Sequence, residues 1–219
     1  MNTNTIPLMA LIFLISSGFL MHPEKPSLQD KRAEEIIKAS QDFYYNLEDM
    51  EIDFSYLVKG ISSRQRIQRG SIQIKKAKYV MKMREQETFC DGSRIWVYLP
   101  GVNEYMVFSM GEWTYGNIMQ LIYSMYFSPS EKTYQGIEML EDGTRTHKIR
   151  FVMKSSDLNY STAYAWYDEE TKLLAKVTFL DRQRRQRTFS FSNLKYNRGV
   201  PNETFVFRPQ NYPGIELRR

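Results

Sequence analysis

Apolar and polar residues alternate along most of the chain beyond residue 50, and this period of two is typical of strands with one buried face. Glu51–Tyr56 and Gly70–Lys75 both alternate without a break. Segments of the same kind recur at short intervals after them. The pattern predicts nine strands, over residues 51–56, 70–75, 79–84, 95–99, 104–109, 148–154, 162–168, 174–180 and 188–194.

Turn-forming residues separate these strands at close spacing. Asp91-Gly92, Pro100-Gly101 and Asp142-Gly143 join neighbouring strands, as do the polar segments 168–171 and 181–186. Connections this short join antiparallel neighbours, whereas parallel strands need long crossovers. Because Asp-Gly is favoured where both central residues of a tight turn have positive φ, we predict that Asp91 and Gly92 are the central residues of their hairpin.

Two segments have helical spacing instead. Between Ala33 and Leu47 the apolar residues recur three or four positions apart, as on one face of an amphipathic helix, and Asp30 is placed to cap it. A second amphipathic helix is predicted between residues 113 and 125, and Pro129 ends it. This second helix falls between the strands expected at 104–109 and 148–154.

The elements together predict an α+β fold with a single domain over residues 27–219 and no internal repeat. A long antiparallel sheet with one apolar face needs cover, which the helices must supply. The expected architecture is a curved antiparallel sheet that forms a half-open β-barrel covered by two or three helices. Such an arrangement can also enclose a ligand cavity between the helices and the sheet.

The candidate lining of this cavity is apolar. Nine methionines follow residue 24, and methionine is over-used on surfaces that accommodate varied apolar ligands because its side chain is flexible and polarizable. The candidate wall residues on the strands are Phe54, Ile72, Ile74, Tyr79, Met81, Met83, Ile95 and Val97. The candidates on the second helix, which would act as a lid, are Ile118, Leu121, Ile122 and Met125.

The sequence carries little that points to catalysis. It has no Gly-rich phosphate loop, no HExxH and no GxSxG. Cys90 is the only cysteine and reads as a small packed residue, while His147 reads as a surface or edge histidine. We therefore expect no enzyme activity, no cofactor and no metal site.

Charge and composition exclude several other classes of protein. The 219 residues are 42% hydrophobic and 25% charged with a net charge of +5, which excludes a disordered chain. Most of this charge is dispersed, so nucleic acid is not an expected partner. One basic cluster, formed by Arg182, Arg184, Arg185 and Arg187, lies at a predicted hairpin tip. It is either a solvated turn or a docking site for an acidic partner.

The N-terminal segment reads as a secretory signal. Ile6–Met21 is an uncharged, apolar stretch, too short for a typical membrane span and of the right length for the core of a signal peptide. Residues 1–24 are therefore predicted to be a signal peptide that directs the protein to the periplasm. The alternative is a retained anchor in the inner membrane, since no Lys or Arg precedes Ile6 and no Ala-x-Ala site follows Met21.

Three segments together resemble the LolA-type outer-membrane lipoprotein carrier family. The first is residues 70–79, GSIQIKKAKY, and the second is residues 91–100, DGSRIWVYLP, which is similar to the family's DG-x-x-hydrophobic-W-x-Y hairpin. The third is residues 205–209, FVFRP, followed by Gly214-Ile215. Their order and spacing match across about residues 30–217. Tyr-Leu-Pro after the Trp resembles the broader outer membrane lipoprotein-sorting proteins.

The resemblance implies a periplasmic, monomeric carrier that holds the acyl chains of lipoproteins, or another lipid, in its half-barrel. Such carriers collect cargo from an inner-membrane ABC transporter and deliver it to an outer-membrane acceptor. The family's Arg-Pro, whose arginine helps to hold the lid closed, appears here as Lys76-Ala77. Lys76 is thus a candidate lid latch that keeps the charge without the guanidinium fork. The alternatives are an envelope scaffold or stress sensor on the same fold, a small outer-membrane barrel, and a periplasmic enzyme.

If the signal is removed, N-terminal sequencing of the mature protein should give a first residue between Gly18 and Ser27. An intact Met1 on membrane-embedded protein would instead establish the anchor.

Overall fold

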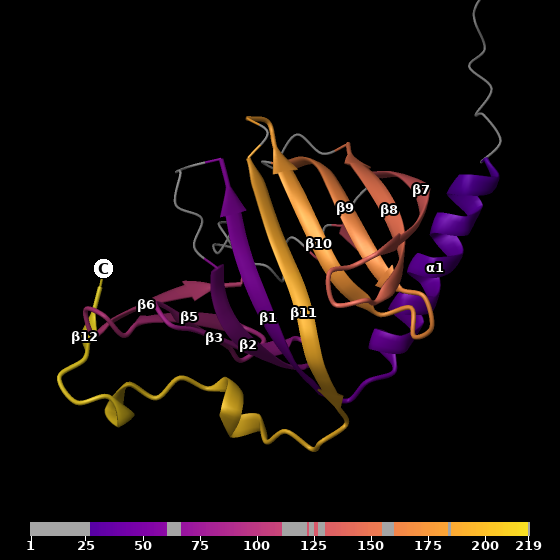
Figure 1. The fold of residues 1–219 in the computed structure, drawn as a ribbon. Coiled ribbons are helices and arrows are strands. Elements are labelled where there is room, and N and C mark those ends of the chain that lie inside the picture. The colour runs from indigo at the N-terminus through magenta and orange to yellow at the C-terminus, as the bar shows by residue number, and fades with distance from the viewer. Residues whose placement is uncertain are drawn as a thin grey trace, which may run out of the picture.

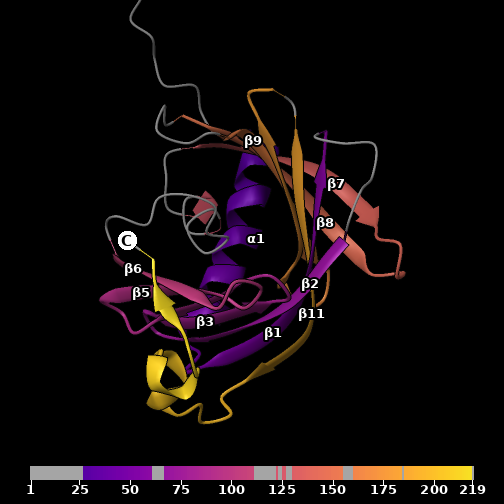
Figure 2. The same cartoon turned by 90° about the vertical axis from the view of Figure 1, so that its left-hand side faces the viewer.

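The computed structural model describes residues 27–60, 67–110, 122, 125–126, 130–154, 160–183 and 185–218. One large sheet curves around a single long helix, α1 (Leu28–Tyr45), which lies within its concave side (Figures 1 and 2). The signal-peptide prediction and the lid residues Ile118 and Leu121 fall outside the described residues. In the described part of the chain, no helix has the length and apolar character needed to cross a membrane.

The sheet contains twelve strands in the order β12-β6-β5-β4-β3-β2-β1-β11-β10-β9-β8-β7. Their bounds are β1 (Met50–Lys59), β2 (Ile67–Lys75), β3 (Lys78–Met83), β4 (Glu87–Cys90), β5 (Arg94–Leu99), β6 (Glu104–Ser109), β7 (Ser130–Met139), β8 (Arg145–Met153), β9 (Tyr160–Asp168), β10 (Leu174–Asp181), β11 (Gln186–Tyr196) and β12 (Glu216–Leu217). Neighbouring strands are antiparallel apart from β12, which pairs with β6 in parallel. The antiparallel pair of β1 and β11 joins the two halves of the sheet.

The fold class predicted from the sequence is confirmed, as are all nine predicted strands. Three further strands, β4, β7 and β12, were not predicted. β4 is four residues long and buries the polar Thr88, and β7 carries charged residues along an edge of the sheet. Neither strand therefore shows the alternation that reveals a half-buried strand.

The helix prediction is confirmed for α1 and needs two corrections. Ser27, rather than Asp30, is the N-cap: its side chain accepts a hydrogen bond from the Asp30 backbone N–H, while the Asp30 carboxylate accepts one from the Ser27 backbone N–H. This reciprocal capping box satisfies two backbone donors that the helix leaves unpaired. The helix also ends at Tyr45, before Leu47.

The helical cover is smaller than predicted within the described residues. Besides α1, the helical residues there are Ile122, Met125 and Tyr126, all of them in or next to the predicted second helix, together with two 3₁₀ turns near the C-terminus. Tyr126 is tied to α1 because its hydroxyl and that of Ser40 lie 3.0 Å apart and form a buried hydrogen bond. Met125 is fully buried against the inner face of the sheet.

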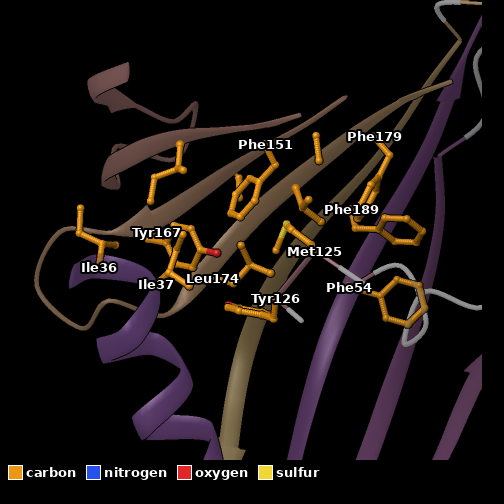
Figure 3. Packing of buried hydrophobic residues seen from close by; sticks show 14 of the residues in the cluster. Ile36, Ile37, Phe54, Met125, Tyr126, Phe151, Tyr167, Leu174, Phe179 and Phe189 are labelled. Carbon is orange, nitrogen blue, oxygen red and sulfur yellow. The ribbon is translucent and has the colours of Figure 1, made fainter. Parts of the chain in front are cut away.

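The main hydrophobic core lies between α1 and the inner face of the sheet (Figure 3). α1 contributes a single face, with Ile36 and Ile37 each at most 3% exposed. The sheet contributes large side chains from strands far apart in sequence. The fully buried residues on the strands include Phe151, Ile149, Tyr167, Val177 and Phe179.

The C-terminal segment covers the convex side of β3–β6 (Figure 2). Phe205 and Phe207 are buried there in a second aromatic cluster with residues such as Trp96 and Tyr98. Asp49, just before β1, holds the start of this segment, since its carboxylate accepts backbone N–H bonds of 2.8–2.9 Å from residues 198–200. Burial alone would raise the pKa of Asp49, but these bonds and nearby Lys75 outweigh it and lower the pKa below its usual value.

The turn between β4 and β5 differs from the prediction by one residue. Its central residues are Gly92 and Ser93, because the Asp91 N–H bonds the Arg94 carbonyl at 3.2 Å. Of the turn residues only Gly92 has positive φ, +98°, as the first central position of a type II′ turn requires. Asp91 is the residue before the two central ones. Its carboxylate accepts hydrogen bonds from the backbone N–H groups of Ser93 and Arg94, both at 2.8 Å, and these bonds stabilise the turn.

Replacing Gly92 with valine should destabilise the protein by about 1–3 kcal/mol, because a β-branched residue is forced into positive φ. The cost does not come from a steric clash with neighbouring residues, since the nearest atom to a Cβ at position 92 would lie 3.8 Å away. The matched control is Gly101→Val in the next hairpin, where φ is ordinary and nothing lies within 4 Å of an added Cβ. Thermal or urea unfolding measures both variants, and equal stabilities would contradict the strain at Gly92.

Candidate ligand-binding cavity

A cavity of about 820 Å³ opens between the C-terminal half of α1 and the inner face of β1 and β2. Most of its lining is apolar or aromatic. These residues come from α1 and the loop after it, from β1 and β2, from the helical residues near 122, and from β10 and β11. They are Tyr44, Tyr45, Leu47, Met50, Ile52, Ile72, Ile74, Ile122, Tyr126, Leu174 and Phe191.

The polar residues of the lining include Gln41, Asp42, Glu48, Asp49 and Lys76. Asp42 is already paired with Lys38 at 2.9 Å. The carboxylate of Asp49 is occupied by backbone N–H groups. The cavity therefore combines an apolar wall with a few polar groups, as ligand sites commonly do.

Tyr44 is a lining residue that the sequence patterns did not single out. Its phenol oxygen accepts the backbone N–H of Leu174 at 3.3 Å, which links α1 to the start of β10. Burial raises the pKa of Tyr44 strongly, so its hydroxyl stays neutral at physiological pH.

Three of the predicted lining residues, Ile72, Ile74 and Ile122, do line this cavity. The remaining described candidates lie on the inner side of the molecule but belong to closed clusters. Phe54, Met81 and Met125 are buried in the main core, against which Met83 packs. Tyr79, Ile95 and Val97 form a separate cluster with Cys90.

The register of the strands explains this division. Ile74 lies opposite Tyr79, Tyr79 opposite Cys90, and Cys90 opposite Ile95, so these side chains share one face of the sheet. Alternation therefore assigned the face correctly. It could not tell which part of that face α1 leaves open, because this depends on where the helix lies.

Lys76, the candidate latch, lies at the turn between β2 and β3 and contributes to the cavity lining. It is exposed, has a φ of +56° and makes no hydrogen bond or ion pair with any described residue. Its position beside the C-terminal half of α1 suits a contact with the cover, but no latch is formed within the described part of the structure.

A second hollow, of about 850 Å³, lies mainly on the outer face of the sheet and is slightly larger. Hydroxyl groups from β1, β10 and β11 line much of it, including those of Ser55, Thr178 and Thr188. Lys176 lies 4.6 Å above the ring of Trp166 at its edge and covers that aromatic surface. Because the wall of this hollow is more polar than that of the inner cavity, the inner cavity is the better candidate for an apolar ligand.

His147 is buried, with 3% of its surface exposed, which corrects the prediction of a surface or edge histidine. Its Nε2 lies 3.1 Å from the Lys172 ammonium, and its Nδ1 lies 3.1 Å from the Tyr134 hydroxyl. Since an ammonium can only donate, Nε2 accepts and the ring proton is on Nδ1. Burial first, and then the charges of Lys172 and Arg32, lower the pKa of His147; Glu169 and Asp168 oppose them.

The fold and the cavity define a class of protein: an unclosed antiparallel half-barrel with a helix on its inner face and an apolar hollow beneath the helix. The family model of the outer membrane lipoprotein carrier protein LolA matches residues 45–208, so the chain belongs to this family. A search of curated proteins finds no match to the sequence.

Solved structures give the same fold. An uncharacterized conserved protein from Thermus thermophilus aligns with a TM-score of 0.57 and 10% identity, over 86% of this chain and 99% of that one. A DUF1329 family protein from Desulfovibrio piger aligns with a TM-score of 0.51 and 13% identity, over 81% and 97%. A LolA superfamily protein from Nitrosomonas europaea has a TM-score of 0.43 and 10% identity, over 80% and 97%. The first two alignments show a shared fold and, at identities this low, nothing beyond the fold.

The burial of His147 predicts a specific pH dependence. Its pKa is lowered in the folded protein, so the unfolded chain binds more protons below the ordinary value of 6.5. The contribution of the neutral ring to stability is therefore present above about pH 6.5 and is lost as pH falls below it. Urea unfolding of wild type and His147→Gln between pH 8 and 5 should show the steeper loss in wild type. If the free energy of unfolding falls equally with pH in both proteins, the prediction is wrong. Carboxylates contribute little to this comparison, because they titrate mainly near ~4, below the range tested.

Proposed function

We propose that this protein carries the acyl chains of lipoproteins, or of another lipid, through the periplasm from the inner to the outer membrane. The observation that supports it most is the apolar cavity between α1 and the inner face of the sheet. Membership of the LolA family supports the same function. In this proposal the protein binds and releases its cargo without chemical change, taking it from an inner-membrane ABC transporter and passing it to an outer-membrane acceptor.

The energetics of acyl chains require such a host. Burying a CH₂ group is worth about 0.8 kcal/mol, so a long chain does not cross an aqueous space unaccompanied at a useful rate. The cavity volume of about 820 Å³ lies within the range of roughly 300–1,000 Å³ that ligand pockets span. Its walls are aliphatic and aromatic, which suits a ligand with few polar atoms.

Release needs a cover that can move, and the contacts of the helical residues near 122 are suited to this. Ile122 lines the cavity and is half-buried, while Met125 and Tyr126 are buried in the main core and the Tyr126 hydroxyl bonds that of Ser40 on α1. Interiors are closely packed, so among these three residues the half-buried Ile122 is the one whose movement costs the least packing.

The proposal predicts that Ile122→Glu abolishes lipid binding but leaves the fold intact. In a fixed core the introduced carboxylate would be buried unpaired at a cost of several kcal/mol. In a movable cover it can reach water. The measurements are thermal unfolding and titration with 1-N-phenylnaphthylamine, an uncharged fluorescent probe. The matched control is Ile137→Glu on β7, where the side chain is 49% exposed and lies outside the cavity.

Two outcomes would contradict the proposal. One is a folded Ile122→Glu variant that binds the probe as well as wild type. The other comes from native mass spectrometry of wild type purified from its own periplasm: a protein that never carries lipid or acylated protein there would be a non-transporting envelope protein on the same fold.

A further inference from the structure

The arginines predicted to cluster at the hairpin between β10 and β11 have different surroundings in the structure. Arg182 is exposed at the tip, and Arg184 lies outside the described residues. The Arg185 guanidinium bonds the buried carboxylate of Asp181, with Nε 2.5 Å from Oδ2. Arg187 differs from Arg182 and Arg185, because it belongs to β11 and faces the interior of the half-barrel.

The strand register places Arg187 on the inner face. It lies opposite Phe179 of β10 on one side and opposite Val58 of β1 on the other. Phe179 is fully buried in the main core, and Figure 3 shows it beside Phe189 on this face. A half-buried guanidinium thus sits at the end of an otherwise apolar surface.

Two tyrosines flank this guanidinium. The Arg187 Cζ lies 5.7 Å from the ring centre of Tyr160, in a cation–π contact. Tyr56 stacks on Phe189 with 4.6 Å between ring centres. Tyr56 pairs with Phe189, two residues from Arg187 on the same face, so its ring is a diagonal neighbour of Arg187. Burial raises the pKa of both phenols, and the charge of Arg187 offsets part of that rise.

Arg187 makes no ion pair with any carboxylate among the described residues. The nearby Asp181 is already engaged by Arg185 and by two backbone N–H groups. Partial burial of an unpaired charge is costly, and proteins usually compensate such a charge with an ion of opposite sign. A guanidinium fork matches the two oxygens of a phosphate or carboxylate group.

We propose that Arg187 and the Tyr56 hydroxyl bind the anionic head group, a phosphate or a carboxylate, of an amphiphile whose chain lies along the inner face. This inference rests on the proposed lipid-carrier function and specifies the chemistry of its ligand. Tyr160 positions the guanidinium from its other side.

The geometry of β1 connects this head-group site with the cavity. Val58 lies beside Arg187, and Ile52 lines the cavity six residues earlier on the same strand. At about 3.3 Å per residue the two ends are about 20 Å apart along the strand. Phe54 and Tyr56 lie between them on the same face, so the surface between the anion site and the cavity is aromatic and apolar, with Phe54 buried in the main core.

The test compares three competitors that displace 1-N-phenylnaphthylamine: dodecyl phosphate, the uncharged 1-dodecanol and inorganic phosphate. Wild type should bind dodecyl phosphate about tenfold more tightly than dodecanol and should bind inorganic phosphate weakly. Arg187→Gln should remove this preference and leave dodecanol binding unchanged. The matched control is Arg182→Gln on the same hairpin, which should behave as wild type.

Further variants keep the test decisive if Arg187→Gln does not fold. Tyr56→Phe retains the stacked ring and should weaken dodecyl phosphate alone, while Arg187→Lys should recover part of the preference. Equal affinities of wild type for the two dodecyl ligands, or an equal loss of both in Arg187→Gln, would overturn the head-group site while leaving the carrier function standing. If inorganic phosphate binds as tightly as dodecyl phosphate, the ligand of this site is free phosphate and not an amphiphile, and the head-group proposal is overturned. Failure of both dodecyl ligands to displace the probe from wild type would overturn the carrier function itself.

Discussion

The apolar inner face of an unclosed sheet is the constraint on which the rest of this structure depends. A closed barrel buries its interior by its own curvature, but this sheet leaves β7 and β12 at its two ends. The inner face must therefore be covered by other elements, chiefly α1. Since α1 does not fill so wide a concavity, the same constraint that requires a cover also leaves room for the cavity at the C-terminal end of α1.

The convex side obeys the same requirement in a different way. Over β3–β6 the outer face is also apolar, and there the chain's own C-terminal segment is the cover. Strands β3, β4 and β5 thus have buried residues on both faces, whereas the outer face of β8–β11 carries lysines and hydroxyl groups. The sheet thus has a packed outer layer over part of its convex side and an inner face that leaves a cavity beside α1.

Sequence patterns predicted the elements and the inner face of the strands well, because alternation directly reports which side chains share a face. They missed β7, where Lys132 occupies an inner-face position opposite Phe151. They also misjudged His147, since its burial depends on Lys172 and Tyr134, which come from a distant turn and a neighbouring strand. The sequence predicted an apolar cavity between the sheet and its helical cover, but of the predicted lining residues that the structure describes only Ile72, Ile74 and Ile122 are found to line it. Its walls combine Tyr44, Ile72 and Phe191, whose proximity follows from the packing of α1 and not from any local pattern.

The pairing of β1 with β11 has a consequence for how the chain reaches this structure. These two strands lie at the centre of the sheet, yet more than 120 residues of chain separate them. Contacts of such high sequence separation slow folding, because the intervening chain must lose its freedom before the contact forms. The first six strands can therefore assemble early, but they lack β11 beside β1 and the C-terminal cover on their outer face. A chain that paired these strands before residues 186–215 joined them would expose apolar surface on both faces, and exposed apolar surface of this kind promotes aggregation.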